Sequence, residues 1–366
     1  MPQTILIAPD KFKGTLTAGE AADAIARGWH AARPEDKIEL LPITDGGDGF
    51  GEIVNGLLGA EPRTTRAVDA AHRPCSATWW WHEQTKTAIV ESARVIGLTQ
   101  LPPQKYHPFE LDTAGLGEVL LAAAEQGARE CLIGIGGSAT NDGGFGMASA
   151  LGWQFFNDHD NKILRWTELH SLAQVRPPDK QRLFERVTVA VDVQNPLLGA
   201  QGCTRIYGPQ KGLQPDDFEF AERCLEQLAT ILSKELHVNC ADEPGAGAAG
   251  GLGYGLRCFA CAKLEPGFKL FARYAKLEQR LEDVDVVITG EGAIDSSSSM
   301  GKGVGELVAA CKRYNIPCIG LAGLMTTDKL FKRAYSLTPA FVTLEEALTN
   351  AAKHLEALAA KAAKEL

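Results

Sequence analysis

The feature that most constrains this chain is the glycine-rich segment Gly134-Ile-Gly-Gly-Ser-Ala-Thr-Asn-Asp-Gly-Gly144, which directly follows the apolar run at residues 131–133. Glycine has no Cβ and adopts positive φ readily, so consecutive backbone N–H groups can approach an anion closely. Residues 147–156 begin as a helix would, and a helix N-terminus adds partial positive charge. Asp142 would repel a phosphate unless a cation lay between them. The segment therefore predicts a loop that binds a metal-bound nucleotide.

Two other interpretations of this loop stay open. Gly134, Gly136 and Ala139 match G-x-G-x-x-A, and Asp158 and Asp160 follow about twenty residues later, as in dinucleotide-binding folds. The loop could also be a tight strand-to-helix turn without a ligand. It is not a Walker A loop, because no Gly-Lys-Ser/Thr closes it.

Composition narrows the class of protein. A chain of 366 residues is longer than one hydrophobic core usually supports, which predicts two domains. The net charge of −9 argues against nucleic acid as a partner.

No apolar stretch reaches the length of a membrane span, and the first residues lack the charged start of a signal peptide. The nine scattered cysteines do not suggest a disulfide framework. We expect a cytoplasmic protein with reduced thiols and no membrane partner.

Short apolar runs alternate with helical patterns along most of the chain. Thr17 and Glu20 form a capping box before an amphipathic helix at residues 18–30. Strands are expected at residues 4–8, 37–43, 131–135, 187–193, 284–289 and 315–321. Helices are expected at residues 113–126, 304–313 and, as one alanine-rich helix, 343–366. This order predicts an α/β fold with a mostly parallel sheet.

Residues 64–90 have a different pattern, with hairpin-like strands and no helix between them. Trp79, Trp80 and Trp81 stand in one of these strands, where we expect two rings to be packed and one exposed. This segment predicts a second, α+β domain inserted into the first, so that both termini belong to one sheet.

Acidic residues follow nearly every expected strand, in turns rich in glycine or proline. Ligands of open α/β sheets bind at the carboxyl ends of the strands. Several carboxylates at one sheet edge would repel one another unless cations lay among them, and Mg²⁺ binds through carboxylates and substrate phosphates. We therefore expect a magnesium-nucleotide site at a shared edge formed by Asp10, Asp45, Asp48, Glu91, Asp192, Glu291 and Asp295.

Three lysines, Lys13, Lys211 and Lys302, stand beside glycine in expected loops, where an ammonium group can meet a phosphate or a carboxylate. Lysines and carboxylates together suit phosphoryl transfer, which depends mainly on positioning and charge neutralisation. Such a reaction also needs an acceptor hydroxyl and a base for its proton. No Ser-His-Asp pattern or paired-histidine zinc motif is present.

Several motifs between residue 8 and residue 302 resemble those of the type-1 glycerate kinases. Residues 8–18 are similar to A-P-D-S-F-K-G-S-L-T-A, residues 45–49 to D-G-G-E-G, and residues 134–144 to G-I-G-G-S-A-T-N-D-G-G. Residues 192–199 and 208–212 resemble D-V-x-N-P-L-x-G followed by G-P-Q-K-G. The segments 244–253 and 289–295 also follow the family pattern.

The resemblance implies ATP-dependent phosphorylation of glycerate, expected at its 2-hydroxyl, with a divalent cation such as Mg²⁺ and release of ADP. It implies two α/β domains, one flavodoxin-like and the other inserted into it. We place the flavodoxin-like domain at residues 1–66 and 286–366 and the inserted domain at 67–285, with the active site in the cleft between them. We expect the protein to be a monomer or a homodimer.

The chain departs from the family pattern after Asp295, where the family has S-Q-T and then G-K-x-P-x-G. Here Ser296–Ser299 and Met300 precede Lys302, and Val304 and Glu306 replace proline and glycine. Lys11 and Phe50 replace a serine and a threonine. These changes bear on domain closure and on the identity of the substrate.

The predicted roles fall into four groups. Asp192 is the expected general base with Asp295 as second choice, and the lysines Lys13 and Lys211 neutralise the transferred group. The ATP phosphates are expected on Gly136, Gly137, Ser138, Ala139, Thr140, Asn141 and Asp142. The metal is expected near Asp45, Asp48 and Glu291. The substrate is expected on Asp10, Glu91, Asn195 and Lys302.

Two alternative functions remain. An NAD-dependent oxidoreductase of a small hydroxy acid would use the loose dinucleotide match. A non-catalytic protein that binds glycerate or nucleotide would account for the serine run.

Overall fold

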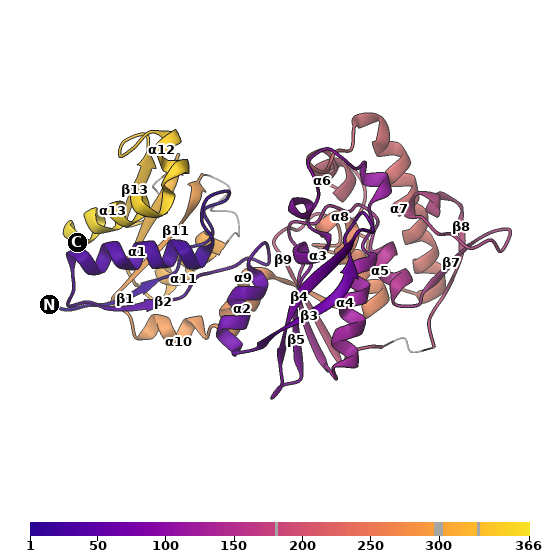
Figure 1. Cartoon of the computed structure of the whole chain (residues 1–366), viewed down its shortest axis with the longest axis horizontal. Helices are drawn as coiled ribbons and strands as arrows, with labels where there is room; N and C mark the ends of the chain where they lie inside the picture. Colours follow the sequence, from indigo (N-terminus) through magenta and orange to yellow (C-terminus); the bar gives the residue numbers. More distant parts are fainter. Residues whose placement is uncertain (180–181, 296–302, 328–329) are drawn as a thin grey trace. The chain divides into compact units, whose positions relative to one another are not determined.

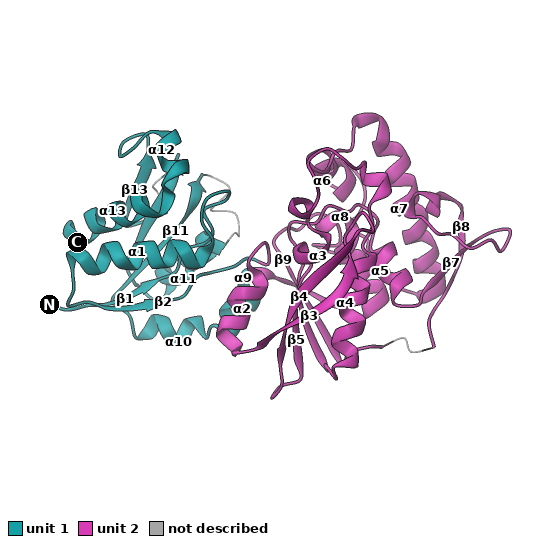
Figure 2. Cartoon of the chain, viewed as in Figure 1, with its two compact units in different colours: residues 1–45, 268–366 teal, residues 46–267 magenta. Residues whose placement is uncertain are grey.

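The computed structural model describes residues 1–179, 182–295, 303–327 and 330–366. The chain forms two compact units (Figure 2). Unit 1 consists of Met1–Asp45 and Phe268–Leu366, and unit 2 consists of Gly46–Gly267. Unit 2 therefore interrupts unit 1 in the chain, and both termini belong to unit 1, as the sequence predicts.

Unit 1 is built on a five-stranded sheet. Its strands are β1 (Thr4–Ile7), β2 (Lys37–Leu40), β11 (Val286–Ile294), β12 (Cys318–Met325) and β13 (Arg333–Thr338). They lie in the order β2-β1-β11-β12-β13, and every neighbouring pair is parallel. Counted along unit 1, this is the order 2-1-3-4-5 of flavodoxin-like folds. The predicted fold class is confirmed.

Helix α1 (Ala18–Ala32) begins at the predicted capping box, in which Thr17 Oγ1 accepts from the Glu20 N–H and the Glu20 carboxylate accepts from the Thr17 N–H. α1 packs against α13 (Ala351–Lys364), as Figure 1 shows. Helix α11 (Gly303–Arg313) connects β11 to β12. α9 (Gly267–Tyr274) and α10 (Leu277–Glu282) precede β11.

The single helix predicted at residues 343–366 is wrong. The segment forms α12 (Leu344–Thr349) and α13, separated by Asn350 at φ −128° and ψ 43°. Thr349 and Asn350 have low helix propensity because their short polar side chains compete for backbone hydrogen bonds. The Thr349 hydroxyl donates to Glu345 O, which ends the first helix.

Unit 2 is built on a six-stranded mixed sheet in the order β10-β9-β6-β5-β4-β3. β3 (Glu61–Val68), β4 (Pro74–His82) and β5 (Thr87–Glu91) are antiparallel, which confirms the predicted hairpins. β5, β6 (Glu130–Gly134), β9 (Arg186–Val191) and β10 (Lys263–Pro266) are parallel. β7 (Gln154–Asn157) and β8 (Leu172–Arg176) form a separate antiparallel pair.

The helices of unit 2 pack around this sheet (Figure 1). They are α2 (Phe50–Leu58), α3 (Ala93–Ile96), α4 (Ala114–Glu125), α5 (Phe145–Ala150), α6 (Cys203–Lys211), α7 (Pro215–Leu236) and α8 (Ala248–Ala260). Short 3-10 turns occur at Leu98–Gln100, Pro108–Glu110 and Trp166–Ser171.

All three tryptophans of β4 are buried, so the expectation of one exposed ring is wrong. Trp79 and Trp81 belong to the main core of unit 2. Trp80 is covered by α2, where a Cβ on Gly51 would lie 2.1 Å from its ring. Because helices cover this strand on both faces, alternation along it does not expose any ring.

The domain boundaries predicted at 66/67 and 285/286 differ from the limits of the compact units at 45/46 and 267/268. The difference arises because α2 and β3 pack with unit 2. Phe50, at the start of α2, lies against the end of β6, where a Cβ on Gly134 would be 2.6 Å from its ring.

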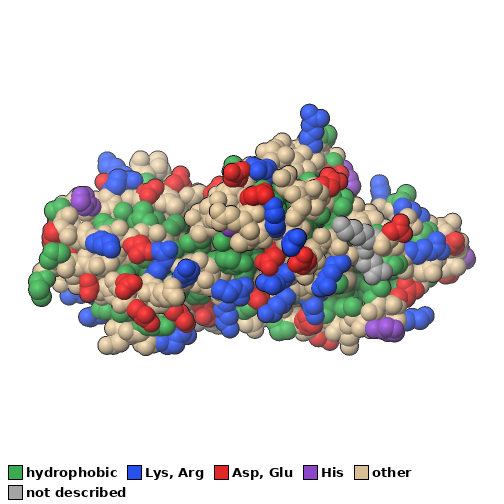
Figure 3. Space-filling model, turned by 90° about the horizontal axis from the view of Figure 1, so that it is seen from below, with side chains coloured by type: hydrophobic (Ala, Val, Ile, Leu, Met, Phe, Trp, Pro, Cys, Tyr) green, Lys and Arg blue, Asp and Glu red, His purple; other side chains and the backbone are tan. Residues whose placement is uncertain are grey.

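Acidic and basic side chains are interspersed on the face of the molecule shown in Figure 3. None of the helices in the described part of the chain combines the length and apolar character needed to span a membrane. All nine cysteines are free thiols.

We predict opposite effects for the same substitution at two glycines of α1. A Cβ on Gly28 would lie 2.0 Å from Glu356 O of α13, so Gly28→Ala should separate the helices and lower the unfolding free energy by about 1–3 kcal/mol. A Cβ on Gly19 meets nothing within 4 Å, so Gly19→Ala should raise the unfolding free energy by about 0.5–1 kcal/mol. Urea unfolding measures both. Equal effects of the two variants would contradict the close packing of α1 on α13.

Candidate active site

The glycine loop, residues 134–144, lies at the carboxyl end of β6 and leads into α5. Its backbone packs directly on the turn that precedes α2. A Cβ on Gly136 would lie 2.6 Å from Gly47 Cα, and a Cβ on Gly137 would lie 2.3 Å from Asp48 Oδ1. Gly137 also has a φ of +76°, which side-chain-bearing residues rarely adopt. Only glycine fits at these two positions, and the structure brings Asp48 against the loop.

Polar groups of the loop are only partly satisfied by the protein. Within the described chain, the N–H groups of Gly137 and Ser138 have no hydrogen-bond acceptor, whereas the Ala139 N–H donates to Ile96 O at 2.9 Å. Asn141 Nδ2 donates to Thr204 Oγ1 at 3.1 Å, but the buried Asn141 Oδ1 has no partner there. Unsatisfied polar groups in a glycine loop are typical of a site that binds a polar ligand.

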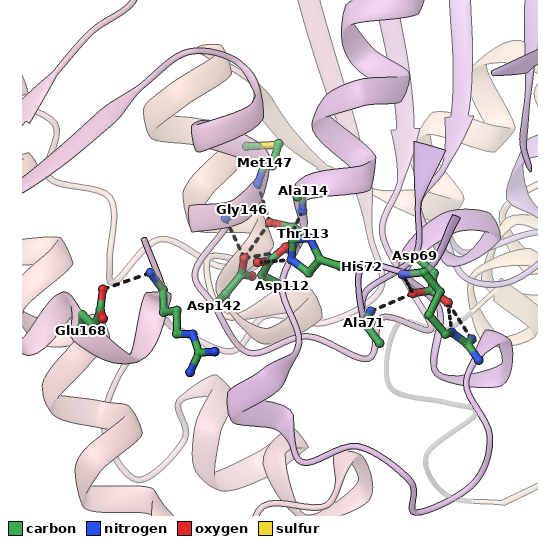
Figure 4. Close-up of polar contacts among 12 residues, drawn as sticks. Asp69, Ala71, His72, Asp112, Thr113, Ala114, Asp142, Gly146, Met147 and Glu168 are labelled. Atoms are coloured by element: carbon green, nitrogen blue, oxygen red, sulfur yellow. Dashed lines mark hydrogen bonds and ion pairs between the residues drawn. The ribbon is translucent and has the colours of Figure 1, made fainter. Parts of the chain in front are cut away.

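The Asp142 carboxylate is turned into the protein, as Figure 4 shows. It accepts from the backbone N–H of Thr113 at 3.0 Å, the Thr113 hydroxyl at 2.7 Å, and the N–H groups of Gly144 at 3.2 Å and Gly146 at 2.9 Å. These bonds connect the loop to the starts of α4 and α5. The carboxylate thus holds the shape of the loop from within.

The nearby Asp112 carboxylate affects the charge of Asp142. Burial, followed by the charge of Asp112, raises the pKa of Asp142 to about 6, while hydrogen bonds from Gly146 and Thr113 oppose the rise. His72 Nε2 lies 2.8 Å from Asp112 Oδ2 (Figure 4). The Asp112 carboxylate therefore disfavours the charge of Asp142.

Lys211, the last residue of α6, is buried beneath the loop. Its Nζ donates to Thr140 O at 2.6 Å, and a Cβ on Gly250 would lie 2.8 Å from that nitrogen. Burial lowers the pKa of Lys211 to about 8, while the Cys203 and Asp142 groups act in the opposite direction. At neutral pH the side chain carries a positive charge directly against the glycine loop.

The turn after β9 carries Asp192 and Asn195. Asp192 is exposed. Asn195 Oδ1 accepts from the Tyr207 hydroxyl at 2.6 Å, and Asn195 Nδ2 donates to Gln201 O at 2.8 Å. Burial raises the pKa of Tyr207 to about 12, and the charge of Asp192 contributes to this rise. Asp192, Asn195 and Tyr207 thus form one polar group beside β9.

Glu91, at the end of β5, holds the N-terminus of α2. Its two carboxylate oxygens accept from the Gly49 N–H at 3.0 Å and the Gly51 N–H at 2.9 Å. The residue is buried, and its charge favours the helix N-terminus. Glu91 thereby fixes the turn that contacts Gly136 and Gly137.

Unit 1 has an acidic cluster of its own, formed by Asp10, Asp45 and Glu291 at the ends of β1, β2 and β11. Burial raises the pKa of Asp10 to about 7, as do the charges of Asp45 and Glu291. The Lys11 N–H, which donates to Asp10 Oδ1 at 2.7 Å, and the Lys11 charge lower it. No three acidic, histidine or cysteine side chains among the described residues are arranged to hold a metal ion by themselves.

The predicted site residues therefore follow strands of two sheets, so the expectation of one shared sheet edge is wrong. Unit 1 carries Lys13, close to Gly292, and the half-buried Asp295 directly after β11. Lys302 and Ser296–Ser299 lie outside the described residues.

Sequence reasoning missed several residues that shape the loop. Thr113 and Thr204 look like ordinary polar residues in the sequence. Ala249, Gly250 and Gly251 have left-handed backbone conformations at the start of α8 and bring their backbone against the loop. In the sequence, only the glycine-rich motif at residues 244–253 indicates that this backbone lies close to the glycine loop.

Comparison with known proteins decides the family. Residues 5–366 match the model of the glycerate kinase family. The chain belongs to this family. It is 36% identical to "Glycerate kinase" of Halalkalibacterium halodurans, covering 96% of this chain and 95% of the relative. It is 37% identical to "Glycerate 2-kinase" of Escherichia coli K12, covering 95% and 93%. A crystal structure of a "putative glycerate kinase 2" from Salmonella typhimurium LT2 superposes with a TM-score of 0.86 at 35% identity, covering 100% of this chain and 98% of that one.

Membership of the glycerate kinase family confirms the resemblance found in the motifs and shows that the chain is a kinase-type enzyme. It favours phosphorylation of glycerate over oxidation of a hydroxy acid.

We predict that Asp142→Asn changes the pH dependence of stability. Because the pKa of Asp142 is raised to about 6 from its ordinary 3.8, its stabilising contribution is complete below pH 4 and is lost as the pH rises through 6. The difference in unfolding free energy between the neutral variant and wild type should therefore shift by about 3 kcal/mol in favour of the variant between pH 4 and pH 7. Urea unfolding at several pH values measures this, with the exposed Asp158→Asn as control. Parallel pH profiles for Asp142→Asn and wild type would contradict the buried charge.

Proposed function

We propose that this enzyme transfers the γ-phosphoryl group of ATP to the 2-hydroxyl of glycerate, with Mg²⁺, and releases ADP and 2-phosphoglycerate. Family membership supports glycerate as the acceptor. The glycine loop is the main support for binding of the nucleotide. Two of its N–H donors have no acceptor in the described chain, and the Lys211 ammonium is buried against it.

The glycine loop suits the phosphates of a nucleotide. Gly137 and Ser138 offer adjacent N–H groups that have no acceptor in the described chain. The Ser138 and Thr140 hydroxyls, 2.9 Å apart, are hydrogen-bonded to each other, which leaves one hydroxyl proton for a ligand. The residues proposed to hold the phosphates are Gly136, Gly137, Ser138, Ala139, Thr140 and Asn141. Asp142 supports them through the backbone of the loop.

Lys211 is proposed to neutralise the phosphoryl group during transfer. Its ammonium is already desolvated and held by Thr140 O, so the protein does not have to reorganise it during the reaction. A pre-positioned charge in a water-poor site stabilises a transition state more strongly than an exposed one.

The carboxylates suit a divalent cation bound together with the nucleotide. Mg²⁺ takes one or two carboxylates and substrate phosphates, which agrees with a set of acidic residues that is no complete metal site by itself. When bound, the ion neutralises charge on the phosphates. Asp45, Asp48 and Glu291 are the proposed ligands, and Asp10 would bind substrate beside Asp45 and Glu291.

Asp192 is proposed to accept the proton of the glycerate hydroxyl. It is exposed at the end of β9, and Asn195 beside it is held by Tyr207 and Gln201, which gives the turn a fixed geometry. Asn195 and Lys302 remain the proposed substrate contacts, with Lys13 and Asp295 as further catalytic candidates. Glu91, predicted to contact substrate, is buried and holds the N-terminus of α2 instead. We propose that the enzyme works in the cytoplasm on a small-molecule substrate, as a monomer or homodimer.

We predict that Asp192→Asn lowers kcat by about 10²–10⁴-fold, because the hydroxyl loses its proton acceptor. ADP release is followed with glycerate and related hydroxy acids, and ³¹P NMR identifies the product. Asp158→Asn, the same change at an exposed turn, should leave kcat unchanged. Full turnover by Asp192→Asn would remove Asp192 from the mechanism. Absence of ADP release by the wild-type enzyme, together with thermal stabilisation by ligand, would favour a non-catalytic binding protein.

We predict that Lys211→Met, which keeps the length of the side chain and removes the charge, lowers kcat by about 10²-fold or more. Lys234→Met in α7, exposed near the end of its helix, is the matched control. Circular dichroism confirms folding of both variants. If Lys211→Met changes KM for ATP but not kcat, the lysine binds the nucleotide without stabilising the transition state.

A further inference from the structure

Two thiols of unit 2 lie side by side, outside the residues assigned to the proposed reaction. Cys240 stands in the segment between α7 and α8, and Cys258 stands in the last turn of α8. Their sulfur atoms are 3.6 Å apart, and both side chains are buried. A disulfide bond needs about 2.05 Å between its sulfurs, so a relative movement of roughly 1.5 Å would allow the bond to form.

The surroundings of Cys240 favour its thiolate form. The hydrogen bond with Cys258 lowers the pKa of the Cys240 thiol, and the charge of Arg257 acts in the same direction, against burial and the charge of Glu243. The same hydrogen bond raises the pKa of Cys258, and so does its burial. A thiol with a lowered pKa next to a second thiol is the arrangement found in cysteines that react with peroxides.

The segment that carries Cys240 is held against α8 at the surface of unit 2. Arg257 Nε and Nη2 donate to Glu243 Oε2 and Oε1, each at 2.8 Å, which keeps the two thiols opposite each other. Asn239, the residue before Cys240, is exposed, and Ala241 after it is half-buried. A small local opening of this surface segment is therefore enough to admit a small oxidant to the sulfur.

We propose that Cys240 and Cys258 are a redox-active pair, which a hydroperoxide converts to a disulfide. First, the Cys240 sulfur attacks the peroxide: an S–O bond forms, the O–O bond breaks, and the leaving oxygen takes the thiol proton. Then the Cys258 sulfur attacks the sulfenic acid: the S–S bond forms, the S–O bond breaks, and water leaves with the Cys258 proton. The two thiols lose two electrons, which reduce the peroxide. A dithiol reductant reverses the change by thiol–disulfide exchange.

The segment that carries Cys240 is bonded to the turn after β9. The Leu197 N–H donates to Ala241 O at 2.8 Å, and the Gly247 N–H donates to Asn195 O at 2.9 Å. A displacement of Cys240 therefore reaches the turn on which a proposed substrate contact lies.

The helix that carries Cys258 contacts the glycine loop. The Gly143 N–H donates to Gly250 O at 3.1 Å, and a Cβ on Gly255 would lie 2.5 Å from Gly143 O. Because a close-packed interior transmits small shifts, joining the two sulfurs would move the support of the glycine loop relative to the turn after β9. We therefore expect the disulfide to lower turnover, an effect that rests on the proposed function.

The first experiment detects the bond itself. Full-length protein is treated with hydrogen peroxide, remaining thiols are blocked with N-ethylmaleimide, and the unreduced digest is analysed by mass spectrometry. A peptide linking Cys240 to Cys258 should appear, and dithiothreitol should remove it. In Cys258→Ser, and equally in Cys258→Ala, dimedone should label the Cys240 sulfenic acid about tenfold faster than the half-buried Cys75, whose pKa is raised by burial.

Absence of the linked peptide would overturn the proposal, as would a link from Cys240 to the exposed Cys261 in its place. Dimedone labelling of Cys75 as fast as Cys240 would also overturn it, because Cys240 would then have no special reactivity. The linked peptide requires neither ATP nor turnover, so this result does not depend on the proposed kinase reaction.

The second experiment measures ADP release with glycerate before and after peroxide. Wild-type turnover should fall about tenfold or more and recover with dithiothreitol. Cys240→Ser, confirmed as folded by circular dichroism, should keep its turnover under the same treatment. Equal loss of turnover in Cys240→Ser would overturn the coupling to the active site, because the peroxide would then act elsewhere.

Discussion

The buried Asp142 carboxylate is the interaction on which the geometry of the glycine loop depends. Four donors from the starts of α4 and α5 and from the loop itself converge on one charged group that is shielded from water. Charge-assisted hydrogen bonds in such surroundings are strong, and an incomplete set would be costly. The carboxylate therefore fixes a backbone that is rich in glycine and would otherwise have much conformational freedom. A loop prepared in this way can bind a phosphate without first being ordered.

Electrostatic balance explains why acidic and basic groups are buried close together in unit 2. Asp142 and Lys211 both lose hydration, and the Asp142 group favours the charged form of Lys211, although Asp112 works against the charge of Asp142. In unit 1, burial and the charges of Asp45 and Glu291 raise the pKa of Asp10 to about 7, against the backbone N–H and the charge of Lys11. The Asp10 carboxyl therefore takes up a proton more readily than an exposed aspartate does.

The sequence predicted the features that depend on local pattern. The Thr17–Glu20 capping box and the mostly parallel sheet follow from cap residues and from the order of the expected strands and helices. The insertion of one unit into the other follows from the changed pattern at residues 64–90 and from the family resemblance. Features that depend on distant packing were not predictable in this way. Trp80 is covered by α2, and Asp142 points inward because Thr113 is there to receive it. The sequence also could not indicate that the acidic strand ends belong to two sheets, because strand order along the chain does not specify which strands pair.

The interrupted connectivity of unit 1 has a consequence for biosynthesis. In its sheet, Ile5 of β1 pairs with Val286 of β11, so β11 is synthesised long after the strand beside which it lies. Unit 2 is continuous in the chain and can fold as soon as it leaves the ribosome, since domains generally fold as units during synthesis. β1 can pair with β2 early, but it must wait for β11, its other neighbour, until most of the polypeptide has been translated. The edge of β1 that pairs with β11 therefore stays open while unit 2 is being synthesised.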